Sequence, residues 1–428
     1  MRIFQSLVWL LLPCAAVGQD HWVATWAASQ TLYRNNTPPR PVAAAAPAPQ
    51  PAPPPPPGTP GRRFGIPAPL ASLHNQTVRM IALTSIGGSN VRIRLSNALG
   101  APAVNIGAAH IALHDSESAI KPGSDRVLTF SSKTAATIYG GETLVSDPVS
   151  LHLPPLSHVA VTLYIPGDAS DPTNHRFALH NTYISKEGDF TSQAAIPDAE
   201  TRESWYWLAG IDVLAPPDAA ALVTFGDSIT DGDQSTPGTD GMWPAILAAR
   251  LQANKATSRI SVVNAGISGN RLLGDNNSGL ARLYHDALTQ PGVRWMSVLI
   301  GINDITGGSR SQTITAETLI AAYRQLIENA HLLNVKVIGC TLTPFGGSNV
   351  YSDYGESVRS AVNRWIRNSG AFDAVVDFDA AVRDSKDPTR FRAEADSPDM
   401  LHPANPGYKM MGDAFGLNIL TSTPMRAR

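Results

Sequence analysis

The residue types at three positions, and the spacing of two of them, suit nucleophilic chemistry. Ser228 comes directly after a short apolar run, in the tripeptide Gly226-Asp227-Ser228. Of the 11 histidines, only His402 has an aspartate, Asp399, three positions before it. A serine nucleophile needs a base that takes its proton, and the base needs an acid that orients it. The spacing therefore favours His402 and Asp399 as the base and its acid, with Ser228 as a candidate nucleophile.

A second histidine has an acidic residue at the same offset. Glu328 precedes His331 by three positions, but both lie inside an amphipathic helical pattern. An exposed contact between residues three apart is the ordinary role of such a pair in a helix. The segment around His402 lies instead before a predicted terminal helix, which favours it as the base.

Loops rich in Gly, Asn, Asp and Ser follow three successive apolar runs. They cover residues 226–232, 264–270 and 301–304. Ligands of open α/β sheets bind beyond the carboxyl ends of the strands, so these loops are expected to converge on one edge of a sheet. Each loop by itself also has the composition that a tight turn requires.

From about residue 220, apolar runs alternate with amphipathic helical stretches. Strands buried on both faces read as continuous apolar runs, so this alternation predicts a parallel sheet with helices on both faces. The predicted strands are residues 221–225, 260–264, 296–300, 335–341 and 374–378, and the predicted helices are 243–252, 316–333, 357–367 and a last one after Pro406.

Four motifs together resemble those of the SGNH, or GDSL-type, hydrolase family. They are Gly226-Asp227-Ser228-Ile229, residues 264–269, Gly301-Ile302-Asn303-Asp304 and Asp399-Met400-Leu401-His402. They occur in the family's order across residues 221–418, about half of the chain. The resemblance implies a flavodoxin-like, three-layer α/β domain with a parallel sheet.

The resemblance also implies roles for individual residues. Ser228 is then the nucleophile, His402 the general base and Asp399 the residue that orients the imidazole. The oxyanion of the tetrahedral intermediate is bound by the backbone N–H groups of Ser228 and Gly269 and by the side-chain amide of Asn303. The implied reaction is acyl transfer to water through an acyl-enzyme, with no metal and no organic cofactor.

Other polar residues near these motifs are expected to be structural. Asp227 and Asp304 neighbour the candidate residues, and aspartates in such turns commonly accept backbone N–H groups. The remaining histidines have no metal-ligand spacing, so the sequence predicts no metal site. Most tryptophans are expected in the core, while Trp205-Tyr206-Trp207 is the best candidate for stacking on sugar rings.

The half of the chain before residue 210 has a different pattern. Residues 90–96 and 158–164 alternate between apolar and polar, with β-branched residues and turn signals around them, which predicts an antiparallel sandwich. This half resembles the β-domain of a secreted subgroup of the family. We therefore expect a jelly-roll-like β-sandwich over residues 19–210 and the hydrolase domain over residues 211–428.

The N-terminal half also contains a Pro/Ala-rich insertion at residues 37–61. Twelve of the 34 prolines lie between Pro38 and Pro60, and residues 41–57 are only Pro, Ala, Val and Gln. Proline lacks the backbone donor, so this segment predicts an extended loop or spacer. A peptide that binds a proline-recognition groove is the less favoured interpretation.

The first residues indicate export. Arg2, the apolar stretch 7–17 and small residues around position 18 are typical of a signal peptide, predicted as residues 1–18. We therefore expect a secreted, extracellular protein, and no later stretch has the length of a membrane-spanning helix. The tripeptides at residues 35–37, 75–77 and 276–278 are candidate N-glycosylation sites.

The charge content argues against nucleic acid as a partner, and the cysteine content argues against an intrachain disulfide in the exported protein. Lys plus Arg is 33 and Asp plus Glu is 35, so the net charge is −2, and there is no basic stretch for nucleic-acid phosphates. Cys14 leaves with the signal peptide, and Cys340 lies in an apolar run, where a small core residue is the favoured interpretation. The sequence sets no oligomeric state.

The expected function is a secreted serine carboxylic ester hydrolase that acts on an ester substrate. Export and the β-domain favour small acyl groups on a carbohydrate, such as an acetylated polysaccharide. A lipase or phospholipase that acts on longer acyl chains is one alternative. A glycan-binding protein with a degenerate hydrolase domain is the other, although all five candidate residues are present.

Overall fold

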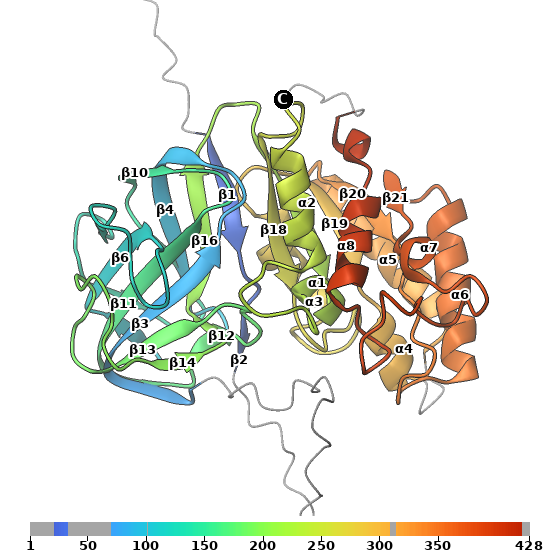
Figure 1. Cartoon of the computed structure of the whole chain (residues 1–428), viewed down its shortest axis with the longest axis horizontal. Helices are drawn as coiled ribbons and strands as arrows, with labels where there is room; N and C mark the ends of the chain where they lie inside the picture. The colour runs from blue at the N-terminus through green and yellow to red at the C-terminus, as the bar shows by residue number, and fades with distance from the viewer. Residues whose placement is uncertain (1–20, 33–69, 101, 309–313, 422–428) are drawn as a thin grey trace, which may run out of the picture.

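The computed structural model describes residues 21–32, 70–100, 102–308 and 314–421 (Figure 1). The predicted signal peptide, the Pro/Ala-rich insertion and the first glycosylation tripeptide lie outside the described residues. Within the described residues, every helix is too short or too polar to span a bilayer.

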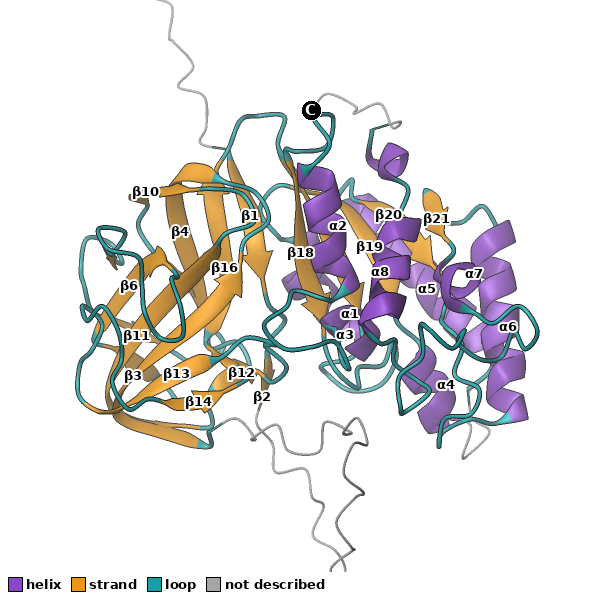
Figure 2. Cartoon of the chain, viewed as in Figure 1, coloured by secondary structure: helices purple, strands orange, loops and turns teal. Residues whose placement is uncertain are grey.

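The N-terminal half contains two large antiparallel sheets, coloured orange in Figure 2. One has the order β1-β16-β4-β10 with β9 also paired to β4, and the other has the order β14-β13-β3-β11-β6-β7. The strands of the first sheet are β1 (Trp22–Ala27), β4 (Gly88–Ser96), β9 (Thr143–Val145), β10 (Val149–Leu153) and β16 (Leu208–Leu214). Those of the second are β3 (Ser72–Leu83), β6 (Ala108–Leu113), β7 (Arg126–Leu128), β11 (His158–Ser170), β13 (Thr182–Glu187) and β14 (Glu200–Arg202).

Alternating side chains from both sheets form one core. On β4, Val91, Ile93 and Leu95 are buried, and they share a cluster with apolar residues of β3, β6 and β11. This agrees with the alternation read from the sequence. The described residues of this half also form two small sheets. One contains β2 (Thr31–Leu32), β12 (Thr173–His175) and β15 (Trp205–Tyr206), and the other contains β5 (Val104–Ile106) and β8 (Ala136–Ile138). The jelly-roll-like topology and the domain boundary at residue 210 stay predictions.

The C-terminal half contains the predicted parallel sheet, in the order β18-β17-β19-β20-β21. Its strands are β17 (Ala220–Gly226), β18 (Ile260–Gly266), β19 (Val293–Leu299), β20 (Lys336–Cys340) and β21 (Ala374–Val376). All neighbouring pairs are parallel. The strand order 2-1-3-4-5 is the flavodoxin-like order. In it the second strand is added on one side of the first strand and all later strands on the other side, so the strand order reverses at the first strand.

Helices cover both faces of this sheet, as Figure 1 shows. On one face lie α2 (Trp243–Gln252), α7 (Phe378–Val382) and α8 (Asn405–Ala414), and on the other α3 (Gly279–Leu283), a π-helical turn (Tyr284–Leu288), α5 (Ala316–Leu332) and α6 (Asp353–Asn368). The short helices α1 (Ser228–Asp231) and α4 (Ile302–Gly308) start beyond the carboxyl ends of β17 and β19, and a 3-10 turn (Leu417–Leu420) follows α8.

The two halves are joined by direct hydrogen bonds beside β1 and β18. The Ser261 hydroxyl donates to the carbonyl of Ala24 at 2.6 Å, and the N–H of Val262 donates to the Ser85 hydroxyl at 3.0 Å. The N–H of Ala24 donates to the carbonyl of Pro291 at 2.9 Å. The N-terminal half therefore packs directly on an edge of the α/β sheet.

Two sequence interpretations of single residues can be compared with the packing. Cys340 is buried in β20, as expected of a core residue. Trp205, Tyr206 and Trp207 are also buried, and the Trp205 ring packs at 4.8 Å from that of Trp26. The suggestion that they stack on sugar rings is therefore wrong, because at most 8% of each residue is exposed and a stacking ring must present a face to solvent.

Candidate active site

Ser228 is placed by the turn between the first parallel strand and the first short helix. It is the first residue of α1, and Asp227 caps this helix by accepting the N–H of Ile229 at 3.0 Å. Gly226 is required just before it, since a Cβ there would lie 2.1 Å from the Thr230 hydroxyl. This tight turn directs the serine toward the sheet edge where the strands end.

His402 is positioned by Asp399 within the segment before α8. One carboxylate oxygen of Asp399 accepts the N–H groups of Leu401 and His402, each at 2.9 Å, and the hydroxyl of Ser397. The other oxygen lies 2.8 Å from Nδ1 of His402. Burial opposes ionisation of Asp399, but these hydrogen bonds hold its pKa well below the usual range. The carboxylate is therefore ionised, and it fixes the orientation of the ring.

The structure brings the three predicted residues into one chain of contacts. Nε2 of His402 lies 2.7 Å from the Ser228 hydroxyl oxygen, while Nδ1 faces Asp399. Burial by itself lowers the pKa of His402, but the negative charges of Asp399 and Asp233 raise it above its usual value. This arrangement allows proton transfer from the serine hydroxyl to the imidazole.

The two other predicted residues lie on the neighbouring loops. Gly269 follows β18 with a φ of +76°, and the space where a Cβ would stand is open. Asn303 is in the first turn of α4, and its side-chain amide donates to the carbonyl of Asn270 at 2.9 Å. An amide nitrogen carries two hydrogens, so one remains for a substrate oxygen.

Asp304 and Asp227 have the structural roles expected of them. The carboxylate of Asp304 accepts the N–H groups of Leu272 and Leu273, which ties the α4 turn to the loop after β18. Burial raises the pKa of Asp227 to about 7, and one of its oxygens is buried without a hydrogen-bond partner. Both residues act on the backbone that supports the site.

A model of the GDSL-like lipase/acylhydrolase family matches residues 224–410. This part of the chain belongs to that family. The match covers all four motifs on which the resemblance was based, which confirms the resemblance, and the chain is a carboxylic ester hydrolase.

Solved structures with GDSL-type folds are also similar to the chain. An acetyl xylan esterase from Geobacillus stearothermophilus is 26% identical, over 49% of this chain and 97% of that one, with a TM-score of 0.38. A lipolytic protein of the G-D-S-L family from Veillonella parvula is 20% identical, over 48% of this chain and 100% of that one, with a TM-score of 0.34. No curated protein matches the chain.

A buried histidine of the N-terminal half, which the sequence does not single out, also contacts the GDSL domain. His175, on β12 of the N-terminal half, places Nε2 at 3.0 Å from Asp231 and Nδ1 at 2.7 Å from the carbonyl of Ser29. The second oxygen of Asp231 accepts the N–H of Ser268, next to Gly269. The N-terminal half therefore contacts a residue that holds a predicted oxyanion loop.

Arg282 also connects the loops that follow β17 and β18. This buried side chain donates to the carbonyls of Gly226 and Ala265, at the ends of β17 and β18. It also donates to the Asn270 side chain, and the Asn270 carbonyl accepts the Asn303 amide. It forms a further hydrogen bond with the hydroxyl of Ser29. No signal in the GDSL motifs points to Arg282 or His175, because both lie outside the motifs and His175 contacts Ser29 and Asp231, which are distant in the sequence.

One group of residues could hold a metal ion. Among the described residues, His158, His180 and Asp240 bring their ligand atoms within 4.8 Å of one another. The sequence predicted no metal, since these residues are widely separated along the chain.

Proposed function

We propose that the chain is an exported serine esterase that removes small acyl groups from a carbohydrate, with Ser228, His402 and Asp399 as its catalytic triad. The observation that carries the proposal is the 2.7 Å contact of the Ser228 hydroxyl with Nε2 of His402, whose other nitrogen lies 2.8 Å from Asp399. Export by a signal peptide at residues 1–18 and a jelly-roll-like domain at residues 19–210 are part of the proposal.

The proposed reaction has two acyl transfers. His402 takes the proton of the Ser228 hydroxyl as its oxygen bonds to the ester carbonyl carbon. The tetrahedral intermediate collapses, the C–O bond to the alcohol breaks, and the alcohol leaves with the proton from His402. A water molecule then gives its proton to His402 and attacks the acyl-enzyme. Collapse of the second intermediate releases the carboxylic acid and returns the proton to Ser228.

Donors for the developing negative charge are proposed from three loops. They are the N–H groups of Ser228 and Gly269 and the amide of Asn303. Gly269 suits this role because open space lies where its Cβ would stand, so a substrate oxygen can approach its backbone. Asn303 suits it because an amide donates a hydrogen bond without carrying a charge.

The preference for small acyl groups rests on the predicted export and β-domain and on where apolar side chains are exposed. Within the described residues, the exposed large apolar side chains are Val127, Tyr139, Val145, Leu156, Tyr284, Leu332 and Leu333. None of them is in the loops after β17, β18 and β19 or in the segment 396–404. A long acyl chain would need an apolar surface near these loops.

A fluorophosphonate probe tests the nucleophile. We expect the wild-type chain to be labelled covalently and Ser228→Ala to lose the label, while Ser357→Ala, an exposed serine on α6, keeps it. Labelling of Ser228→Ala at another serine would place the nucleophile elsewhere.

A substrate panel tests the acyl chain and the alcohol. Acetate release from acetylated plant-wall polysaccharides is compared with fatty-acid release from lipids, and p-nitrophenyl esters are compared from acetyl to octanoyl. We expect acetate release and a rate that falls with chain length. A rise toward octanoyl would indicate a lipase, and glycan binding without hydrolysis of any ester would indicate a degenerate domain.

A further inference from the structure

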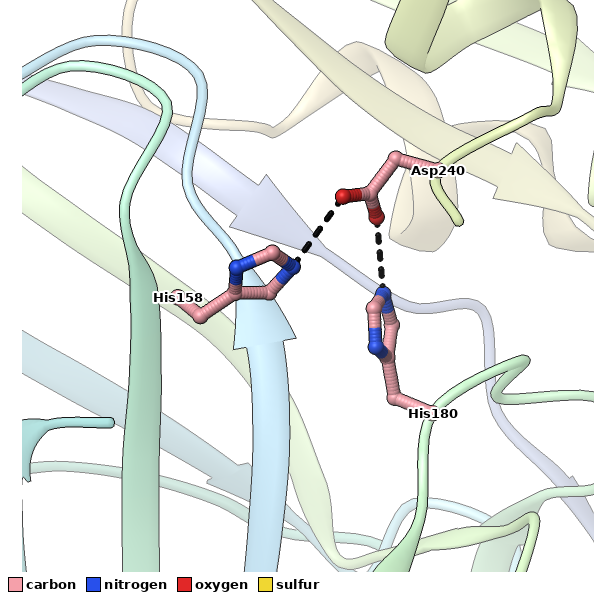
Figure 3. Close-up of side chains that lie close together, drawn as sticks. All are labelled: His158, His180 and Asp240. Carbon is pink, nitrogen blue, oxygen red and sulfur yellow. Dashed lines mark hydrogen bonds and ion pairs between the residues drawn. The ribbon is translucent and has the colours of Figure 1, made fainter. Parts of the chain in front are cut away.

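Three residues with metal-binding side chains meet at the boundary between the two halves of the molecule. His158 begins β11, His180 lies in the loop between β12 and β13, and Asp240 lies in the loop between α1 and α2 of the GDSL domain (Figure 3). Two imidazoles from the N-terminal half therefore face one carboxylate from the catalytic half.

The ligand atoms are arranged around one point. Nε2 of His158 lies 3.1 Å from one oxygen of Asp240, and Nε2 of His180 lies 2.9 Å from the other. In Figure 3 both rings direct these nitrogens at the carboxylate. Ligand atoms of a tetrahedral zinc site with bonds of about 2.1 Å lie roughly 3.4 Å apart. The three ligand atoms here lie within 4.8 Å of one another, so rotations of the side chains that bring the most distant atoms closer would admit one ion.

A second observation points to a ligand at this position. Nε2 of His158 is buried, and its 3.1 Å contact with Asp240 is an ion pair that lacks the alignment of a hydrogen bond. A buried ring nitrogen without a well-aligned hydrogen bond is incompletely satisfied, and a metal ion would use its lone pair. The His158 side chain as a whole is 33% exposed, which gives an ion and a water ligand access from solvent.

We propose that His158, His180 and Asp240 form a binding site for a divalent zinc-class cation that joins the N-terminal half to the GDSL domain. Two imidazole nitrogens and one carboxylate oxygen suit Zn²⁺, whereas Mg²⁺ and Ca²⁺ prefer oxygen ligands throughout. Three protein ligands leave the fourth position to water.

The site would act on the loop that reaches the catalytic histidine. This loop runs from Gly232 to Gly241, and Asp240 lies near one end of it. At the other end, an oxygen of Asp233 lies 3.9 Å from Nε2 of His402. In between, the N–H of Gly238 donates to the carbonyl of Leu179, next to His180. A bound ion would therefore fix this loop against the N-terminal half, without taking part in ester chemistry.

Calorimetric titration of the full chain with Zn²⁺, after treatment with EDTA, tests the site. We expect one ion per chain, and at least about ten-fold weaker binding for His180→Gln and for Asp240→Asn. His331→Gln is the matched control, since His331 also contacts a carboxylate, that of Asp373, but belongs to no group of three ligands among the described residues. Wild-type affinity in His180→Gln and Asp240→Asn, or no binding by the wild-type chain, would overturn the proposal.

Two further measurements separate this site from the proposed catalysis. Ser228→Ala is expected to bind Zn²⁺ like the wild-type chain, so failure of the esterase proposal would leave the metal result intact. Hydrogen–deuterium exchange of residues 232–241 is expected to slow when Zn²⁺ is added, and to stay unchanged in Asp240→Asn. Exchange that is equally fast with and without Zn²⁺ in the wild-type chain would overturn the proposed effect on the loop.

Discussion

The segment before α8 and the boundary around His175 each contain a buried histidine–aspartate pair, and the two pairs differ in what the second ring nitrogen faces. Nε2 of His402 faces the Ser228 hydroxyl, which can give up a proton. Nδ1 of His175 faces the carbonyl oxygen of Ser29, which has no proton to give. A histidine beside an aspartate is thus a candidate base only where its other nitrogen meets a hydroxyl.

The proton count on His175 supports this distinction. Its Nδ1 must carry a hydrogen to bond a carbonyl oxygen, and its contact with Asp231 shares one more proton between ring and carboxylate. Burial lowers the pKa of His175, but the charge of Asp231 and its hydrogen bond raise it. Neither ring nitrogen is therefore free to accept a proton from a substrate or a nucleophile.

The largest expected effect is on the His402 pair. We expect His402→Gln to lower kcat on a small acetyl ester by about 10⁴ to 10⁶, because the serine loses its base. The melting temperature should change by only a few degrees. Steady-state kinetics with His331→Gln as the control measure this difference. A loss smaller than ten-fold would remove the basis for treating the two pairs differently.

A smaller loss is expected at the amide that faces the same site. Asn303→Ala should lower kcat by about 10² to 10³, since one donor to the oxyanion is removed. KM should change little if the donor acts mainly in the transition state. Asn368→Ala, at the exposed end of α6, is the matched control. An unchanged kcat in Asn303→Ala would exclude the amide from the oxyanion site.

The His175 pair should affect folding more than turnover. His175→Leu leaves Asp231 buried without its partner, so we expect the free energy of unfolding to fall by about 3–5 kcal/mol. The kcat of the folded fraction should fall by no more than about ten-fold. Urea unfolding and active-site titration measure the two quantities separately.

A double variant sharpens this test. His175→Leu with Asp231→Asn removes both charges, so part of the lost stability should return. If His175→Leu instead matched His402→Gln in kcat while staying fully folded, His175 would have a direct part in catalysis.

The same comparison explains what could be predicted from the sequence. Asp399 and His402 are three residues apart in one loop, so their contact follows from local spacing. The five parallel strands were also predicted, because continuous apolar runs between amphipathic helices have few other structures. Both predictions depend on patterns within about ten residues.

The contacts that were missed depend on tertiary structure. His175 and Asp231 are 56 residues apart and come from different halves, and the group of His158, His180 and Asp240 is assembled in the same way. The burial of Trp205–Trp207 was also missed, since an aromatic run has the same sequence whether a second sheet covers it or not. Only the packing of the two halves decides these positions.

The smallest expected effect concerns Asp233, whose charge lies on the serine side of the His402 ring. His402 must be neutral to act as a base, so kcat/KM should rise with pH through its raised pKa and then level off. Asp233→Asn removes a negative charge 3.9 Å from Nε2, which destabilises the imidazolium and lowers that pKa.

The acidic limb of the pH profile should therefore move to lower pH by about one unit, since a charge at this distance contributes about 1 kcal/mol or more. Asp168→Asn removes the same charge from an exposed position of β11 and should leave the limb in place. A limb that moves to higher pH in Asp233→Asn would mean that Asp233 does not act on His402 through its charge. An equal shift in both variants would mean that net charge, and not the position of Asp233 beside the His402 ring, sets the pKa of His402.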